Sequence, residues 1–187
     1  MAADKPLSSR RILIMATDGF EQSELEVPLE RLKDAGADVD VASLGTGEIT
    51  GWDGDDWGDD VEVDLVIADA KASDYDALVL PGGQINPDLL RVEESAIALI
   101  KDFAGAGKPV AAICHAPWLL VEAGLVKGRR ITSYKSIRTD VANAGATVVD
   151  EPAVVDRNII TSRCPDDLPS FCDAIIDALT NVQAPVE

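Results

Sequence analysis

The chain has 187 residues, of which 47% are hydrophobic and only 4% aromatic, enough for one domain with a core of aliphatic side chains. With 34 acidic and 16 basic residues, its formal net charge is −18. This charge argues against nucleic acid and anionic membranes as partners, because both are bound through clusters of Lys and Arg. The low lysine content beside so many acids is typical of a protein from a high-salt cytoplasm, where salt screens self-repulsion.

Cysteine and histidine are too sparse for a metal or disulfide framework. The three cysteines, Cys114, Cys164 and Cys172, form no Cys-x-x-Cys pair and have no regular spacing. A single histidine, His115, is too few for a typical zinc site, so we expect no metal and no cofactor. The start of the chain lacks the pattern of a secretory signal, and no stretch is apolar for long enough to span a membrane. These features are typical of a cytoplasmic protein.

In chain order, the hydrophobic pattern alternates between strands and helices. Segments 11–16 and 38–44 are predicted strands on either side of a helix over 21–35, a β-α-β unit of a parallel sheet. Further strands are predicted at 75–81, 110–113, 130–133, 146–149, 153–155 and 159–162, and further helices at 93–106, 117–123, 137–143 and 167–179. We expect one domain over residues 10–180, with loose termini at 1–9 and 181–187.

The segment 45–63 differs from the rest because it carries a run of acidic residues around Trp52 and Trp57. One interpretation is a calcium loop, but the spacing of the acids does not match an EF-hand. The interpretation we favour is a solvated acidic loop or hairpin with short strands at 48–50 and 61–63, because runs of charge usually face water. Residues 86–88, Asn-Pro-Asp, are predicted to form a second loop.

The strongest functional pattern is the junction at Cys114. The apolar strand 110–113 runs into Cys114 and His115, and Pro117 opens a helix where its missing N–H costs nothing. Unpaired N–H groups at this helix start are predicted to lower the pKa of the thiol and to bind an oxyanion on a substrate. The junction lies at the carboxyl edge of the sheet, where open α/β proteins bind ligands. The alternatives are a buried structural cysteine and a packed histidine.

Several ordered motifs resemble those of the PfpI family, which shares the class I glutamine amidotransferase-like fold. They are FEQSEL at 20–25, LPGG at 80–83, AAICHAP at 111–117, TSY at 132–134 and TSR at 161–163. The resemblance covers residues 12–179. It implies an α/β fold, a flavodoxin-like three-layer sandwich with a central, mainly parallel sheet and a nucleophile elbow.

The resemblance also implies roles for particular residues. Cys114 is implied to be the nucleophile, with the carboxyl of Glu21 beside its thiol. Gly83 and the backbone of His115 are implied to form an oxyanion hole. His115 is implied to act as a base, oriented by an acid from a neighbouring subunit at the position of Asp88.

Two of these positions, Asp88 and Tyr134, leave alternatives open. Asp88 stands where a familiar form of the family has a glutamate, and the shorter side chain puts its reach to His115 in doubt. Tyr134 is implied to line the pocket, although core packing at a strand end is its alternative. Cys164 and Cys172 are expected to be packing residues.

Members of the family include glyoxalases, protein deglycases, peptidases and stress chaperones. We expect a cysteine-dependent stress-response enzyme, a glutathione-independent glyoxalase or deglycase that acts on small carbonyls or glycated substrates. The alternatives are an intracellular cysteine peptidase with a Cys-His-acid triad and a redox-sensing chaperone whose Cys114 is oxidised. The resemblance also implies a homo-oligomer, either a dimer or a hexamer.

Overall fold

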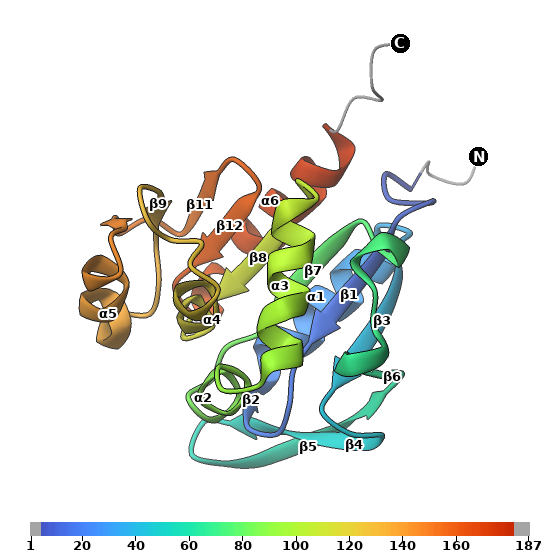
Figure 1. Ribbon diagram of the computed structural model, residues 1–187. Helices are drawn as coiled ribbons and strands as arrows, with labels where there is room; N and C mark the ends of the chain where they lie inside the picture. Colours follow the sequence, from blue (N-terminus) through green and yellow to red (C-terminus); the bar gives the residue numbers. More distant parts are fainter. Residues whose placement is uncertain (1–4, 182–187) are drawn as a thin grey trace.

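The computed structural model describes residues 5–181, and its centre is a seven-stranded sheet in the order β11-β12-β8-β7-β1-β3-β6 (Figure 1). Neighbouring strands are parallel except for β11 and β12, which are antiparallel. The strands are β1 (Arg11–Met15), β3 (Asp38–Ser43), β6 (Leu65–Val66), β7 (Ala77–Leu80), β8 (Val110–Ile113), β11 (Ala153–Asp156) and β12 (Ile159–Ser162). The predicted mainly parallel sheet is therefore confirmed.

Helices cover both faces of this sheet. Those on one face are α1 (Gln22–Asp34) and α6 (Leu168–Thr180); those on the other are α3 (Glu94–Gly105) and α4 (Pro117–Glu122), with α2 (Ile85–Leu90) and α5 (Arg138–Asn143) beside α4. None of the helices within residues 5–181 has the length and hydrophobicity to cross a lipid bilayer. The arrangement is the predicted flavodoxin-like three-layer sandwich.

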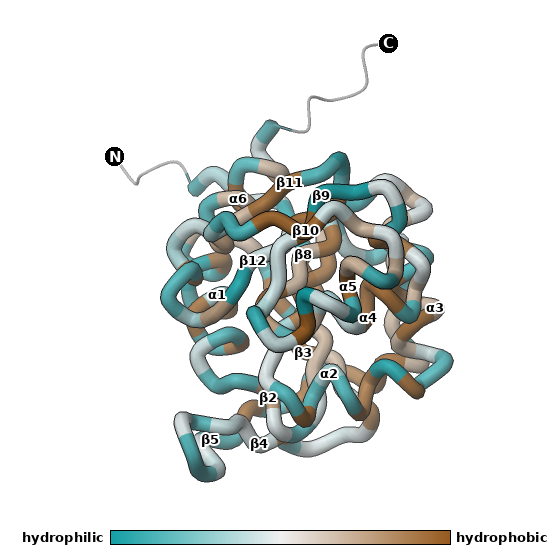
Figure 2. The backbone as a smooth tube through the Cα atoms, turned by 90° about the vertical axis from the view of Figure 1, so that its left-hand side faces the viewer, coloured by the Kyte–Doolittle hydropathy of each residue, from teal (hydrophilic) through white to brown (hydrophobic). Residues whose placement is uncertain are grey.

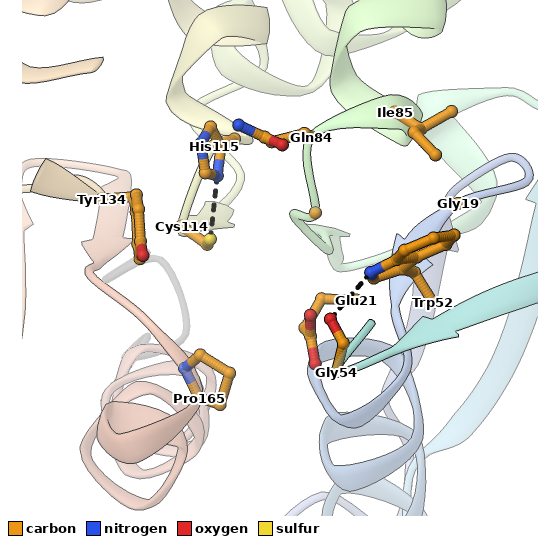
Figure 3. A pocket seen from close by; sticks show the side chains of 11 residues that line it. Gly19, Glu21, Trp52, Gly54, Gln84, Ile85, Cys114, His115, Tyr134 and Pro165 are labelled. Carbon is orange, nitrogen blue, oxygen red and sulfur yellow. Dashed lines mark hydrogen bonds between the residues drawn. The ribbon is translucent and has the colours of Figure 1, made fainter. Parts of the chain in front are cut away.

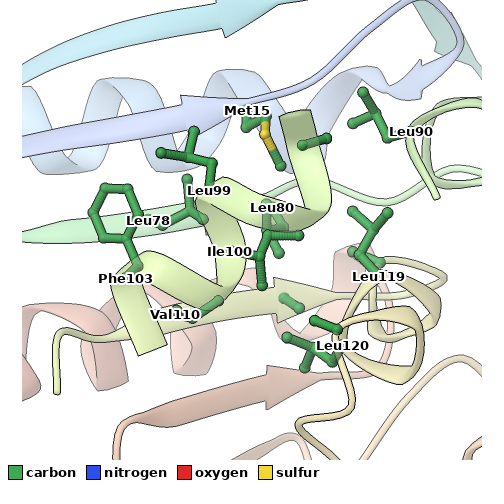
Figure 4. Packing of buried hydrophobic residues seen from close by; sticks show 14 of the residues in the cluster. Met15, Leu78, Leu80, Leu90, Leu99, Ile100, Phe103, Val110, Leu119 and Leu120 are labelled. Carbon is green, nitrogen blue, oxygen red and sulfur yellow. The ribbon is translucent and has the colours of Figure 1, made fainter. Parts of the chain in front are cut away.

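The central strands β7 and β8 are apolar throughout because the side chains on both of their faces are covered. Successive residues of a strand point to opposite faces, so β1 contributes to two separate cores. Leu13 and Met15 pack with Phe103 of α3 in the first core, which Figure 4 shows. Ile12 and Ile14 pack with residues of α1 and α6 in the second core. These two cores hold β7 and β8 rigidly, and their carboxyl ends carry the candidate site.

The acidic segment forms an antiparallel hairpin of β4 (Gly47–Asp53) and β5 (Asp56–Val63), with longer strands than predicted. The short strand β2 (Phe20–Glu21) pairs with β4, and the hydrophilic hairpin projects from the body of the domain (Figure 2). Trp52 and Trp57 pair across the hairpin, edge to face, with ring centroids 5.4 Å apart. Such a cross-strand aromatic pair stabilises a hairpin that has little core of its own.

The prediction of a loop at 86–88 was wrong, because these residues lie within helix α2 (Ile85–Leu90). Pro87 occupies the first helical turn, where no intrahelical N–H bond is required. The side chain of Asn86 is buried and accepts a hydrogen bond from the N–H of Thr17 at 2.8 Å. Its amide donates to two carbonyls of the preceding loop, those of Pro81 and Gly82. These tertiary bonds fix the helix start, and the local sequence does not reveal them.

The N-terminal segment is less loose than the sequence predicted. The side chain of Leu7 is fully buried in the second core, and its N–H donates to the carbonyl of Ala35 at 2.9 Å. Residues 5–9 therefore pack onto the domain, whereas residues 1–4 and 182–187 of the predicted loose termini lie outside the described part of the chain.

Candidate active site

Cys114 directly follows β8 and adopts a strained backbone conformation. Its φ angle is 64°, in the left-handed region that residues other than glycine rarely occupy, at a cost of about 1–3 kcal/mol. The turn is held by two hydrogen bonds, from the Cys114 N–H to the carbonyl of Ser162 and from the N–H of Tyr134 to the carbonyl of Cys114. This is a nucleophile elbow, which places the sulfur at the carboxyl edge of the sheet.

An open cavity of about 420 Å³ lies against the elbow (Figure 3). It is lined by Gly19, Glu21, Trp52, Gly54, Gly83, Gln84, Ile85, Cys114, His115, Tyr134 and Pro165. Tyr134 and Pro165 form one side of the cavity, and Glu21 and Trp52 face them across it. Thus the predicted site residues Glu21, Gly83, Cys114, His115 and Tyr134 all border one cavity, and Asp88 does not.

The sulfur of Cys114 is buried, and burial is the largest influence on its pKa. Burial raises the pKa of the thiol, and the negative charge of an ionised Glu24 raises it further. Hydrogen bonds from the backbone N–H groups of Gly83 and His115 lower it, and these are the two groups expected to form an oxyanion hole. The predicted lowering of the pKa by the helix start was therefore wrong in direction.

The reason lies in how the start of α4 uses its own N–H groups. Pro117 has no N–H. The N–H of Ala116 donates to the carbonyl of Ile113, and that of Trp118 to the carbonyl of His115. These donors are occupied by the turn and do not reach the sulfur, so the thiol keeps its proton until a base removes it.

The carboxyl group beside the thiol belongs to Glu24 and not to Glu21. Glu24 is fully buried, and its Oε2 accepts a hydrogen bond from the N–H of Gly82 at 2.9 Å. Glu21 lies three residues earlier, at the end of strand β2, where its half-buried side chain faces the open cavity. Glu24 stands on the inward face of α1 with Leu25 and Pro28, so a carboxyl group within an apolar helix face was the signal that sequence reasoning missed.

Burial raises the pKa of Glu24 to about 8, and repulsion from Glu21 adds to this effect. At neutral pH the carboxyl group is therefore protonated. Among the described residues, its Oε1 is buried without a partner of good hydrogen-bond geometry, although the carboxyl group interacts with the Cys114 thiol. A protonated Glu24 does not repel a thiolate and can donate its proton to the sulfur.

His115 is only 4% exposed and contacts Cys114 directly. Its Nδ1 lies 3.1 Å from Sγ of Cys114, and its Nε2 lies 3.1 Å from Oγ of Ser136. The ring stacks on Tyr134 with centroids 4.7 Å apart, and Trp118 packs against its edge. Burial lowers the pKa of His115, so the imidazole is neutral and can accept a proton at neutral pH.

Asp88 is exposed on α2, and its side chain makes no hydrogen bond or ion pair within residues 5–181. Within a single chain, Ser136 and not Asp88 contacts the far nitrogen of His115. Ser136 was not identified from the sequence, because it lies 21 positions after His115 and carries no motif of its own.

The buried Glu24 predicts a pH-dependent stability. In the unfolded chain it ionises near 4.5, but in the folded protein only near 8. Between these values the folded state holds a proton that the unfolded state has lost. The free energy of unfolding should therefore fall as the pH rises, by up to about 1.4 kcal/mol per pH unit. Urea unfolding between about pH 5 and pH 8 should give a shallower slope for Glu24→Gln than for the wild type, and equal slopes would contradict the assignment.

The fold and the site define an α/β protein with a nucleophile elbow, in which a strained cysteine lies beside an imidazole and a buried acid. The chain belongs to the DJ-1/PfpI family, whose family model matches residues 10–178. A protein named a deglycase from Thermococcus kodakarensis is 48% identical over 158 residues, which cover 84% of this chain and 92% of that protein. YraA of Bacillus subtilis, whose name describes it as a cysteine protease, is 44% identical over 164 residues, which cover 87% of this chain and 94% of that protein.

Among solved structures, Drosophila melanogaster DJ-1beta superimposes with a TM-score of 0.83 and 30% sequence identity, over 92% of this chain and 91% of that chain. The names of the sequence relatives support an enzymatic role of the deglycase or protease kind.

Proposed function

We propose that this protein is a cysteine-dependent enzyme of carbonyl stress, a glutathione-independent glyoxalase and deglycase. The observation that carries the proposal is the position of one sulfur between two proton carriers. Sγ of Cys114 lies 3.1 Å from a neutral imidazole and beside the buried, protonated carboxyl of Glu24, at the wall of an open cavity. The deglycase names among the relatives support the same class of substrate.

In the proposed reaction, His115 takes the thiol proton of Cys114 at Nδ1, and the sulfur attacks the aldehyde carbon of methylglyoxal. The N–H groups of Gly83 and His115 stabilise the oxyanion formed in this attack, and the imidazolium of His115 then returns its proton to the oxygen to give a hemithioacetal. His115 then removes the hydrogen from this carbon while the ketone oxygen takes up a proton, which gives an enediol. A proton is returned to the neighbouring carbon and the former aldehyde oxygen loses its proton, which leaves a thioester of lactate. Water cleaves the thioester, so methylglyoxal and one water give lactate and the free thiol.

The walls of the cavity favour carbonyl adducts of basic groups as substrates. Glu21 lies in the wall, close enough to Asp53 for its pKa to be raised by repulsion as well as by burial. Among the described residues, Glu21 forms no ion pair, and the acidic residues of the hairpin 47–63, which include Asp53, form none either. An aromatic ring beside free carboxylates attracts guanidinium and ammonium groups, and Trp52 supplies that ring. This supports deglycation of arginine and lysine adducts at the same thiol.

The test is lactate formation from methylglyoxal without glutathione, in molar salt. We expect turnover by the wild type and its loss in Cys114→Ser, because a serine hydroxyl is a far weaker nucleophile without a strong base. Cys164→Ser is the matched control, since Cys164 lies outside this cavity, and it should keep its turnover. A folded wild type that binds thiol reagents at Cys114 but makes no lactate and releases no adduct would overturn the proposal.

A cysteine peptidase is the second candidate, favoured by the 3.1 Å contact between Cys114 and His115. It needs an imidazolium stabilised by an acid, and within the described chain no carboxylate contacts His115. Hydrolysis of fluorogenic peptides that is lost in Cys114→Ser, together with an absence of lactate, would favour this candidate.

A further inference from the structure

The far side of the His115 ring contacts a hydroxyl group in the same chain. Ser136 is the middle residue of the 3-10 helix η3 (Lys135–Ile137), and its Oγ lies 3.1 Å from Nε2. The opposite nitrogen, Nδ1, lies 3.1 Å from Sγ of Cys114. The imidazole therefore bridges the nucleophile and Ser136.

The two contacts are linked because a neutral imidazole carries only one proton. If Nδ1 is to accept the proton of Cys114, it must be unprotonated, and the ring proton must then be on Nε2. A proton on Nε2 needs an acceptor, and Oγ of Ser136 is placed to accept it.

We propose that Ser136 is a positioning residue of the reaction, which holds His115 in the tautomer with its proton on Nε2 and so keeps Nδ1 free to deprotonate Cys114. The contacts of His115 with Cys114 and with Ser136 thus both lie within one chain, without a residue of a neighbouring subunit. The inference rests on the proposed function only for its kinetic test.

The proton step balances without a further reactant. The S–H bond of Cys114 breaks, and its electron pair stays on the sulfur. A new N–H bond forms at Nδ1, and His115 becomes an imidazolium that still donates from Nε2 to Ser136. Because a hydroxyl carries no charge, it stabilises this imidazolium less than a carboxylate would, and the imidazolium readily returns its proton to the bound substrate.

The surroundings of His115 contain few other groups that could set its tautomer. The ring lies between Tyr134, stacked on its face, and Trp118, which packs on its edge and donates to Asp140. Cys114 is the titratable group on the Nδ1 side, with Glu24 beyond it. Ser136 makes the hydrogen bond on the Nε2 side among the described residues.

The tautomer can be observed directly, because His115 is the only histidine in the chain. Nitrogen-15 chemical shifts of histidine-labelled protein at neutral pH should show a protonated Nε2 and an unprotonated Nδ1 in the wild type. In Ser136→Ala the two tautomers should mix, whereas Ser136→Thr should restore the wild-type pattern. A wild type with its proton on Nδ1 would overturn the proposal whether or not methylglyoxal is the substrate.

Kinetics provide the second readout. Because Ser136 is exposed and water can replace its hydroxyl, Ser136→Ala should lower kcat/KM only about 3- to 10-fold. Ser136→Asp should move the acid limb of the pH–rate profile upward by about one unit, since a carboxylate raises the pKa of an adjacent imidazole. Ser73→Ala is the matched control, an exposed serine at the middle of the 3-10 helix η2 (Ala72–Asp74), and it should change neither readout.

Asp88 supplies the competing explanation. A downward shift of the acid limb in Asp88→Asn, with no shift in Ser136→Asp, would assign the orientation of His115 to a carboxylate of a neighbouring copy and overturn the proposal. If the wild type proves to have no turnover at all, the proposed function fails, but the nitrogen shifts still decide the role of Ser136.

Discussion

Glu24→Gln should lower kcat/KM for methylglyoxal by about 100-fold or more, because proton transfer by a positioned group contributes about 10²–10⁴-fold. The amide is nearly isosteric and can still accept the hydrogen bond from Gly82, so the fold should be kept. It cannot release a proton to the sulfur or to the substrate. Steady-state lactate formation in molar salt measures the effect, and circular dichroism checks that the variant is folded.

Two other glutamates make this prediction specific. Glu30 is exposed on the same helix, and Glu30→Gln should have wild-type turnover. Glu21→Gln alters the wall of the cavity but not the buried acid, and should change KM more than kcat. If Glu21→Gln lost turnover while Glu24→Gln retained it, the buried acid would not be the proton carrier, and the sequence-based choice of Glu21 would be restored.

Gly83→Ala should destabilise the protein by about 3 kcal/mol and abolish most of the turnover. Gly83 has a φ of +80°, and a Cβ there would lie 2.6 Å from the carbonyl oxygen of Gly19 and 2.7 Å from the backbone nitrogen of Glu21. Backbone atoms on both sides leave no space, so the loop must move. Its N–H would then leave the sulfur of Cys114 and the position of the oxyanion.

Gly124→Ala separates the cost of the left-handed backbone conformation from the cost of the steric clash. Gly124 has a similar φ of +73°, but a Cβ there would meet nothing within 4 Å. It should cost only the left-handed conformation itself, about 1–2 kcal/mol, and leave kcat unchanged. Urea unfolding of both variants measures the difference. Equal destabilisation would show that the close approach at Gly83 costs nothing.

The sequence by itself determined the sheet and the sharp turn at Cys114. Continuous apolar runs such as 110–113 are strands because both faces are buried, and the local period of the pattern carries that information. The elbow at Cys114 was predictable for the same reason, since an apolar strand followed directly by a proline-initiated helix leaves only a sharp turn between them.

Only the tertiary structure decided which groups lie beside the sulfur of Cys114. Both Glu21 and Glu24 lie in one motif, and the choice between them depends on which face of α1 meets the sheet. Ser136, which contacts Nε2 of His115, lies 21 residues later in the chain. It follows Tyr134, whose ring stacks on the imidazole. The pKa of the thiol depends on burial and on donors from the loop after β7. The distances between these groups, their burial and their pKa values depend on residues that are far apart in the chain. The local sequence pattern therefore determines the strands and helices, whereas tertiary packing determines the surroundings of the sulfur.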